Sequence, residues 1–247
     1  MRKRLNIEKN FIAEISTNWQ VGDLIVVSSR PGRGKTRFLL SIIQSETFQQ
    51  TPVEFISINY DANVNKCYNG IHEVCSLKEN KHTPLAIPFR VTQDIKNYLQ
   101  DISKVKDIKY VFIDNIDLIG EPLSDILIQL KIMAQELSII IITTIPLDNA
   151  GKYEHVRPSL SALKRKIPII ERFADFIYLI YRPIYYTATP KEASLAHIII
   201  AKNKDGETGY FLACVIKTTL IFEDFDPYKV IDSFWFEGKD CLGDTSK

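Results

Sequence analysis

The sequence has no strong excess of either charge: 31 Lys and Arg against 30 Asp and Glu leave a formal net charge of +1 at pH 7. A global attraction to nucleic acid or to a membrane surface is therefore excluded, and any basic surface must be local. The cysteines form no CxxC pair. Thiols in a reducing cytosol are favoured over a zinc site or disulfides for all four, Cys67, Cys75, Cys214 and Cys241.

Long apolar runs are also missing. The longest, such as SIIIITTI, have the length of a strand and fall far short of the roughly 20 residues that span a bilayer. The basic start MRKRLNIEKN is not followed by the apolar region of a signal peptide. We therefore expect a cytoplasmic protein with no membrane segment.

What the sequence does contain is an alternation of short, β-branched apolar runs with amphipathic segments of about a dozen residues. Strands are predicted at 24–29, 53–58, 109–114 and 138–144, with helices at 35–44, 91–102 and 123–137 and a helix followed by a loop over 61–81. This order is typical of a parallel, doubly wound α/β sheet. The last third has three strand-like runs, at 174–181, 196–203 and 209–216, with no helical pattern between them. They predict an antiparallel extension of the same sheet, within one domain.

The stretch SSRPGRGKTRF, Ser28 to Phe38, ends in the Gly-Lys-Thr of a phosphate-binding loop, although Ser29 stands where the usual pattern has its first glycine. The predicted strand before it and helix after it supply the context that such a loop needs. Lys35 would reach the β- and γ-phosphates, and the Thr36 hydroxyl would hold Mg²⁺. Asp114, at the end of the strand YVFID, is the acid that would complete the metal site. The residues expected to bind ATP are Ser29, Arg30, Pro31, Gly32, Arg33, Gly34, Lys35, Thr36 and Arg37.

Several blocks, in order, resemble the C-terminal motor domain of the DnaB-type replicative helicases. They are NWQVGDLIVVSSRPGRGKTRF, YVFIDNIDLI, RPSLSALK, ERFADFIYLIYR and HIIIAKNKDGETG. The resemblance implies a RecA-like P-loop NTPase fold over residues 18–225, after a linker-like segment at 1–17 and before a tail at 226–247. It also implies Mg-ATP as ligand, a homo-oligomeric ring and action on single-stranded DNA. The family's N-terminal helical collar domain has no counterpart in this sequence, which puts primase contact in doubt.

Three hydrolytic positions of the family differ here. Its catalytic Glu is replaced by Asn59, which cannot accept a proton, so Asp61 becomes the candidate substitute. Its Ser-Gln sensor reads Thr143-Thr144. Its Lys-x-Arg finger, donated across a subunit interface, reads Lys202-Asn203-Lys204, which keeps the charge and loses the planar fork. The pattern predicts ATP binding with weakened hydrolysis.

A basic cluster, Lys164-Arg165-Lys166, lies beside the family's DNA-facing segment and is a candidate to contact a phosphate backbone. A solvated surface cluster is the competing interpretation. Lys152, with Tyr153 beside it, is a candidate for the same surface.

Three functions therefore stay open. The first is an ATP-driven motor on single-stranded DNA. The second is an ATP-binding switch or interaction protein that has lost hydrolysis. The third is a regulatory RecA-like ATPase in recombination or in the maintenance of a mobile element.

Overall fold

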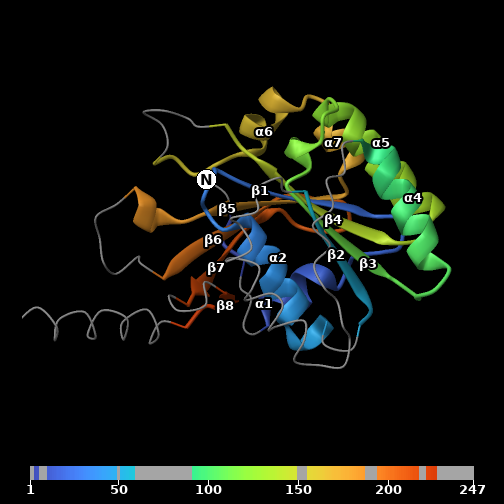
Figure 1. Cartoon of the computed structure of the whole chain (residues 1–247). Coiled ribbons are helices and arrows are strands. Elements are labelled where there is room, and N and C mark those ends of the chain that lie inside the picture. The colour runs from blue at the N-terminus through green and yellow to red at the C-terminus, as the bar shows by residue number, and fades with distance from the viewer. Residues whose placement is uncertain are drawn as a thin grey trace, which may run out of the picture.

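The computed structural model describes residues 3–5, 10–48, 51–58, 91–148, 155–186, 194–216 and 221–226. These residues form one eight-stranded sheet in the order β2-β3-β4-β1-β5-β6-β7-β8. The strands are β1 (Leu24–Ser29), β2 (Val53–Ser57), β3 (Tyr110–Asp114), β4 (Ile140–Pro146), β5 (Phe176–Tyr181), β6 (Leu195–Asn203), β7 (Gly209–Val215) and β8 (Phe222–Asp224). The strands β1 to β5 pair in parallel and β6 to β8 add in antiparallel fashion (Figure 1). The predicted fold class, a mostly parallel sheet with an antiparallel extension, is confirmed. The run at 174–181, expected in that extension, instead forms β5 and pairs in parallel with β1.

Helices cover both faces of the sheet (Figure 1). They are α1 (Phe11–Ser16), α2 (Lys35–Gln44), α4 (Thr92–Ser103), α5 (Leu123–Glu136), α6 (Leu160–Lys166) and α7 (Ile170–Phe173), with 3₁₀ turns η1 (Glu46–Phe48), η3 (Ile116–Leu118) and η5 (Pro183–Tyr185). Side chains of α4 to α7 share one hydrophobic core, and those of α1 and α2 share the other. Because both faces are covered, all six residues of β1 are buried, which explains its continuous apolar pattern.

The two ends of the described chain meet at α1. Its start is capped by Asp224 of β8, whose carboxylate accepts the backbone N–H groups of Asn10 (2.6 Å) and Phe11 (2.8 Å). Phe11 also packs on Phe211 of β7, with ring centroids 5.3 Å apart. The segment Phe11–Ser16 is thus a helix that packs into the core.

His197 of β6 is buried between two tyrosines. Its ring stacks on Tyr210 and meets Tyr181 edge-on, each at 5.6 Å between centroids, and its Nδ1 finds no hydrogen-bond partner among the described residues. Burial above all, and then repulsion by Arg157 and Arg4, lowers the pKa of His197 from the ordinary 6.5 to about 4. The ring is therefore neutral in the folded protein at neutral pH.

This environment predicts a pH-dependent stability. Because the folded-state pKa lies below the unfolded value, the contribution is fully present above about pH 6.5 and is lost as the pH falls toward about 4. We expect His197→Phe, which keeps the stacking, to remove about 2 kcal/mol of that pH dependence. Urea unfolding of both proteins between pH 7 and about 4.5 measures it, and parallel profiles for the two would contradict it.

Candidate nucleotide-binding site

The phosphate-loop sequence leaves the carboxyl end of β1, which lies between β4 and β5. Gly34 caps the amino end of α2 with φ at +102°, a conformation that L side chains rarely adopt. A Cβ atom there would also approach the Phe222 ring to 3.1 Å. Ser29 is fully buried and its hydroxyl donates to the carbonyl of Arg30 (2.9 Å), so this serine fits where the family pattern has a small residue. Strand, loop and helix thus follow in the order predicted.

The strand order places the hydroxyl and the carboxylate of the predicted metal site in contact. The Thr36 hydroxyl, in the first turn of α2, donates to Asp114 Oδ2 over 2.6 Å. Asp114 ends β3, is fully buried, and also accepts the Asn115 side-chain amide at 3.1 Å. Hydroxyl and carboxylate oxygens are the ligands that Mg²⁺ prefers, so this pair fits the metal expected of the site.

Burial sets the electrostatics of the site. It raises the pKa of the Asp114 carboxyl, against the opposing hydrogen bonds from Thr144 and Thr36 and the charge of Lys35. It lowers the pKa of Lys35, which is 9% exposed, while the charges of Asp114 and Asp117 oppose that shift. A buried cation next to the loop is complementary to an anionic ligand such as a polyphosphate.

Thr144 makes two hydrogen bonds at the end of β3 that could not be predicted from the sequence. Its hydroxyl donates to Asp114 Oδ1 (2.5 Å) and accepts the backbone N–H of Asn115 (2.8 Å). Thr143 donates to the carbonyl of Ile113 (2.9 Å). The two threonines at the position of the family's sensor therefore orient the end of β3.

Asp117 is a further carboxylate of the site that sequence reasoning missed. It lies in η3, directly after β3, and its Oδ1 is buried without a hydrogen-bond partner in the described part of the chain. Its charge acts on both Lys35 and Asp114. A sequence signal existed, because the acid recurs three residues after Asp114 in the run DNID.

Arginine and tyrosine side chains flank the loop. The Arg33 guanidinium lies 3.9 Å from the centroid of the Tyr185 ring and donates to the Tyr186 hydroxyl (3.1 Å). Arg30 lies over Tyr186 at 5.4 Å and donates to the carbonyl of Val156 (2.9 Å). The two tyrosines, to which the sequence assigned no role, thus hold the loop's arginines against η5 and the segment before α6.

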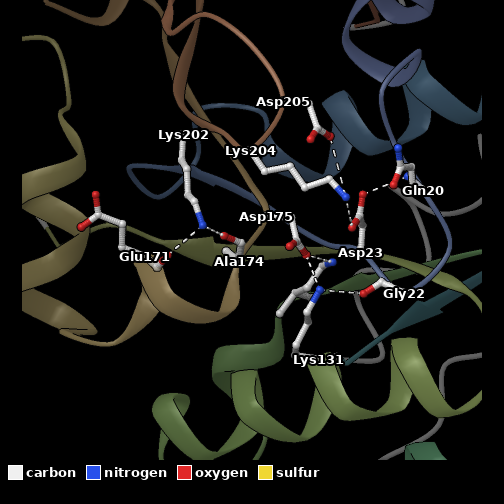
Figure 2. A network of polar contacts seen from close by, with 11 residues as sticks. Gln20, Gly22, Asp23, Lys131, Glu171, Ala174, Asp175, Lys202, Lys204 and Asp205 are labelled. Atoms are coloured by element: carbon white, nitrogen blue, oxygen red, sulfur yellow. Dashed lines mark hydrogen bonds and ion pairs between the residues drawn. The ribbon is translucent and has the colours of Figure 1, made fainter.

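The candidate finger residues lie at the amino ends of the parallel strands, whereas the phosphate loop lies at their carboxyl ends. Asn203 at the end of β6 pairs with Phe176 at the start of β5, and β5 runs parallel to β1. Figure 2 shows their contacts: Lys202 donates to the carbonyls of Glu171 (2.8 Å) and Ala174 (2.5 Å), and Lys204 forms an ion pair with Asp23 (2.6 Å). Within one copy of the chain, neither lysine is near Lys35.

The basic cluster lies on a helix, α6. Lys164 forms an ion pair with Glu171, and Lys166 contacts Asp148 (3.1 Å) and the carbonyl of Pro146 (2.9 Å). Arg165 is exposed, and the described residues offer it no hydrogen bond or ion pair. Three residues of the prediction, Asn59, Asp61 and Lys152, lie outside the described residues, as does Tyr153.

A known family model covers most of the strands that surround this site. The model, described as "DnaB-like helicase C terminal domain", matches residues 74–224, more than half of the chain. The chain belongs to this family. The phosphate loop precedes the matched region, so the loop is supported separately, by its own sequence and geometry.

Similar proteins agree with this assignment. The chain is 26% identical over 239 residues to "Replicative DNA helicase DnaB" of Geobacillus stearothermophilus, covering 82% of this chain and 52% of that protein. It is 28% identical over 240 residues to "Probable plasmid replicative DNA helicase" of Chlamydia psittaci, covering 81% and 50%. The chain thus spans about half the length of the relatives that it matches.

Solved structures show the same fold. The chain superposes on a separately solved ATPase domain with a TM-score of 0.73 at 21% identity, covering 87% of this chain and 90% of that one. For the structure of a DnaB-like replicative helicase and its interactions with primase, the TM-score is 0.71 at 21% identity, covering 85% and 59%. The predicted RecA-like ATPase fold is confirmed.

Neither a cluster of metal ligands nor a membrane-spanning helix is found in the described part of the chain. The described ranges contain no group of three or more His, Cys, Asp or Glu side chains arranged to hold a metal ion. No described helix has both the length and the apolar composition required to cross a membrane.

Proposed function

We propose that the chain is a Mg-ATP-binding motor domain that assembles into a homo-oligomeric ring and acts on single-stranded DNA. The observation that carries this proposal is the meeting of Thr36 and Asp114 beside the buried Lys35, at the carboxyl edge of the sheet. In open α/β sheets, ligands bind outside the carboxyl ends of the strands, at the point where the connections from two neighbouring strands run to opposite sides of the sheet. The DnaB names of the similar proteins support the same function.

The residues divide the work of ATP hydrolysis. Backbone N–H groups of residues 32–36 and the Lys35 ammonium would bind the phosphates, and Thr36 and Asp114 would hold Mg²⁺, which would supply positive charge to stabilise them. A water molecule attacks the γ-phosphorus and the bond to the β-phosphate oxygen breaks, giving ADP and phosphate. A carboxylate that accepts a proton from that water completes the reaction. Asp61, expected from the sequence, and Asp117, found in the structure, are the two candidates for it.

The ring is part of the proposal because the candidate finger lysines lie far from the phosphate loop of their own copy. Lys202 and Lys204 lie at the edge opposite to the loop, so they would act on the nucleotide of a neighbouring copy. The DNA contact is proposed for the exposed face of α6, where Arg165 would bind a phosphate. Lys152, Lys164 and Lys166 would add positive charge to the same surface. A cytoplasmic location follows from this function.

Steady-state ATP hydrolysis, with and without single-stranded DNA, tests the proposal, with Lys35→Ala as the blank. We expect turnover above the blank that rises several-fold with DNA. Binding of ATP with turnover equal to the blank, in the presence of DNA, would reject the motor.

A non-hydrolysing ATP-binding switch is the second candidate. The observation favouring it is that the Thr144 hydroxyl is already used to orient Asp114 and Asn115, so it cannot also sense a γ-phosphate. Asn59 in place of the family's Glu points the same way. This candidate predicts that ATP and a non-hydrolysable analogue promote assembly equally, which light scattering measures.

A further inference from the structure

Two ion pairs join the amino ends of the central strands to their neighbours, at the sheet edge away from the phosphate loop (Figure 2). Asp23, just before β1, accepts Lys204 through Oδ1 (2.6 Å) and the backbone N–H of Gln20 through Oδ2 (2.9 Å). Asp175, just before β5, accepts Lys131 of α5 (2.6 Å) and the backbone N–H of Leu24 (2.8 Å). The side chain of Asp23 is only 4% exposed, so its orientation is fixed by the fold.

The two candidate lysines differ in what remains free. An ammonium group has three N–H donors. Lys202 gives two of them to the carbonyls of Glu171 and Ala174 at the end of α7, which is the role of a helix C-terminal cap. Lys204 gives one to Asp23, and its side chain remains 25% exposed. By this count, the described residues leave Lys204 two N–H donors for a ligand and Lys202 one.

The charge of Lys204 is secure in this position. Burial opposes the charge, but the hydrogen bond and attraction to Asp23, with smaller contributions from Asp205 and Asp175, outweigh it and raise the pKa of Lys204. The Asp205 carboxylate lies 3.8 Å away and is itself 41% exposed. Lys204 thus stays protonated at neutral pH.

We propose that Asp23 is a positioning residue that holds the Lys204 ammonium so that its remaining N–H groups bind the polyphosphate of a nucleotide on a neighbouring copy of the chain. This inference rests on the proposed function, since it needs the ring and the trans action of Lys204. Asp23 itself touches no nucleotide.

The physical reason for an anchor is entropic. A free lysine side chain loses up to about 2 kcal/mol of conformational freedom when a ligand orders it. Asp23 orders Lys204 before the ligand arrives, so less is lost on binding. Lysine lacks the planar fork of arginine, and an external carboxylate that fixes its direction compensates for part of that difference.

The location adds a second consequence. Asp23 and the phosphate loop are joined by β1, a buried strand of six residues paired on both sides. The lysine that faces one neighbour is thereby fixed relative to the loop of its own copy. Consecutive sites in a ring would share a rigid element.

A double-mutant cycle on nucleotide affinity tests the proposal without relying on turnover. The probe is a fluorescent ATP analogue with Mg²⁺, titrated into the assembled oligomer of each variant. We expect Lys204→Ala and Asp23→Ala each to weaken binding about tenfold, and the double variant to weaken it no more than either alone. Asp23→Asn, which keeps an acceptor oxygen, should weaken it by less, about threefold.

Lys131→Ala is the matched control, because it breaks an ion pair of the same length at the same edge without touching Lys204. It should leave nucleotide affinity unchanged even where it lowers the free energy of unfolding. Thermal unfolding of every variant checks folding. If Asp23→Ala does not fold, Asp23→Asn carries the test.

Experiments that mix subunits of different variants separate the trans role of Lys204, which belongs to the proposed function, from the positioning role of Asp23. Lys35→Ala subunits carry an intact Lys204, so adding them to Lys204→Ala or to Asp23→Ala subunits should restore turnover, whereas Lys204→Ala mixed with Asp23→Ala should not. If Lys204→Ala alone changes neither affinity nor turnover, the trans role in the proposed function is rejected, and the inference with it. Suppose instead that Lys204→Ala weakens binding. If Asp23→Ala then leaves the affinity unchanged or tightens it, or if the effects of the two substitutions add in the double variant, only the inference about Asp23 is overturned.

Discussion

Replacing Asp114 by Asn should separate the stability of the fold from its ability to bind Mg-ATP. Without nucleotide, we expect the free energy of unfolding to rise by about 1 kcal/mol, because a charge with no exposure to water is removed while the shape is kept. The Thr36 hydroxyl can still donate to the remaining amide oxygen, and the Thr144 hydroxyl, which now donates to Asp114, can rotate to accept from the new NH₂ group. The buried carboxylate thus costs the empty protein stability.

With Mg-ATP bound, the wild-type protein should instead be more stable than Asp114→Asn. At a ligand concentration of about 100 times Kd, binding adds about 2.7 kcal/mol to the wild-type protein. Asp114→Asn should lose most of that increment, since an amide is a poor ligand for Mg²⁺, and turnover should fall to the level of Lys35→Ala. Urea unfolding with and without Mg-ATP measures both parts.

The control for this prediction is Asp125→Asn, which removes an exposed acid in the first turn of α5. It should change neither quantity by more than about 0.5 kcal/mol. An Asp114→Asn protein that is less stable than wild type when empty, or that keeps its Mg-ATP increment, would contradict the argument.

Much of the fold could be predicted from the sequence, because local patterns determine it. The run LIVVSS is apolar throughout most of its length and becomes β1, and the strand-like runs at 196–203 and 209–216 become β6 and β7 of the antiparallel extension. Lys35, Thr36 and Asp114 could be assigned because a phosphate loop needs a strand, a helix and a second acid in a fixed order. Each of these residues is identified by the pattern immediately around it, although Thr36 and Asp114 are 78 residues apart in the sequence.

The remaining features depend on register and on long-range contact. Nothing local to Thr144 shows that its hydroxyl will meet Asp114, because that contact depends on how β3 and β4 pair. The cap that Lys202 provides for α7 depends on where β6 ends beside β5. The link from Asp224 to α1 joins residues 213 and 214 positions apart. Sequence spacing carries no information about such contacts.

The proton acceptor of the reaction is the other large effect to test. The family's Glu is absent, and Asp61 was expected to replace it because it follows Asn59 by two residues. The structure adds Asp117, whose buried Oδ1 has no hydrogen-bond partner in the described residues, although its charge acts on Lys35 and Asp114. An unpaired buried carboxylate oxygen is unfavourable unless a ligand or water satisfies it. This favours Asp117 as the group that orients the attacking water and accepts its proton.

We therefore expect Asp117→Asn to lower turnover by about 10² or more, the usual contribution of a general base, while affinity for the ATP analogue stays the same or tightens. Tightening has a physical cause, because one negative charge near the phosphates is removed. Asp61→Asn is the competing variant and should retain most of the wild-type turnover. Single-turnover hydrolysis of both variants, alongside their binding constants, measures the effect. Loss of turnover in Asp61→Asn with a normal rate in Asp117→Asn would assign the proton to Asp61, whereas equal loss of binding and turnover in Asp117→Asn would make Asp117 a structural residue of the loop.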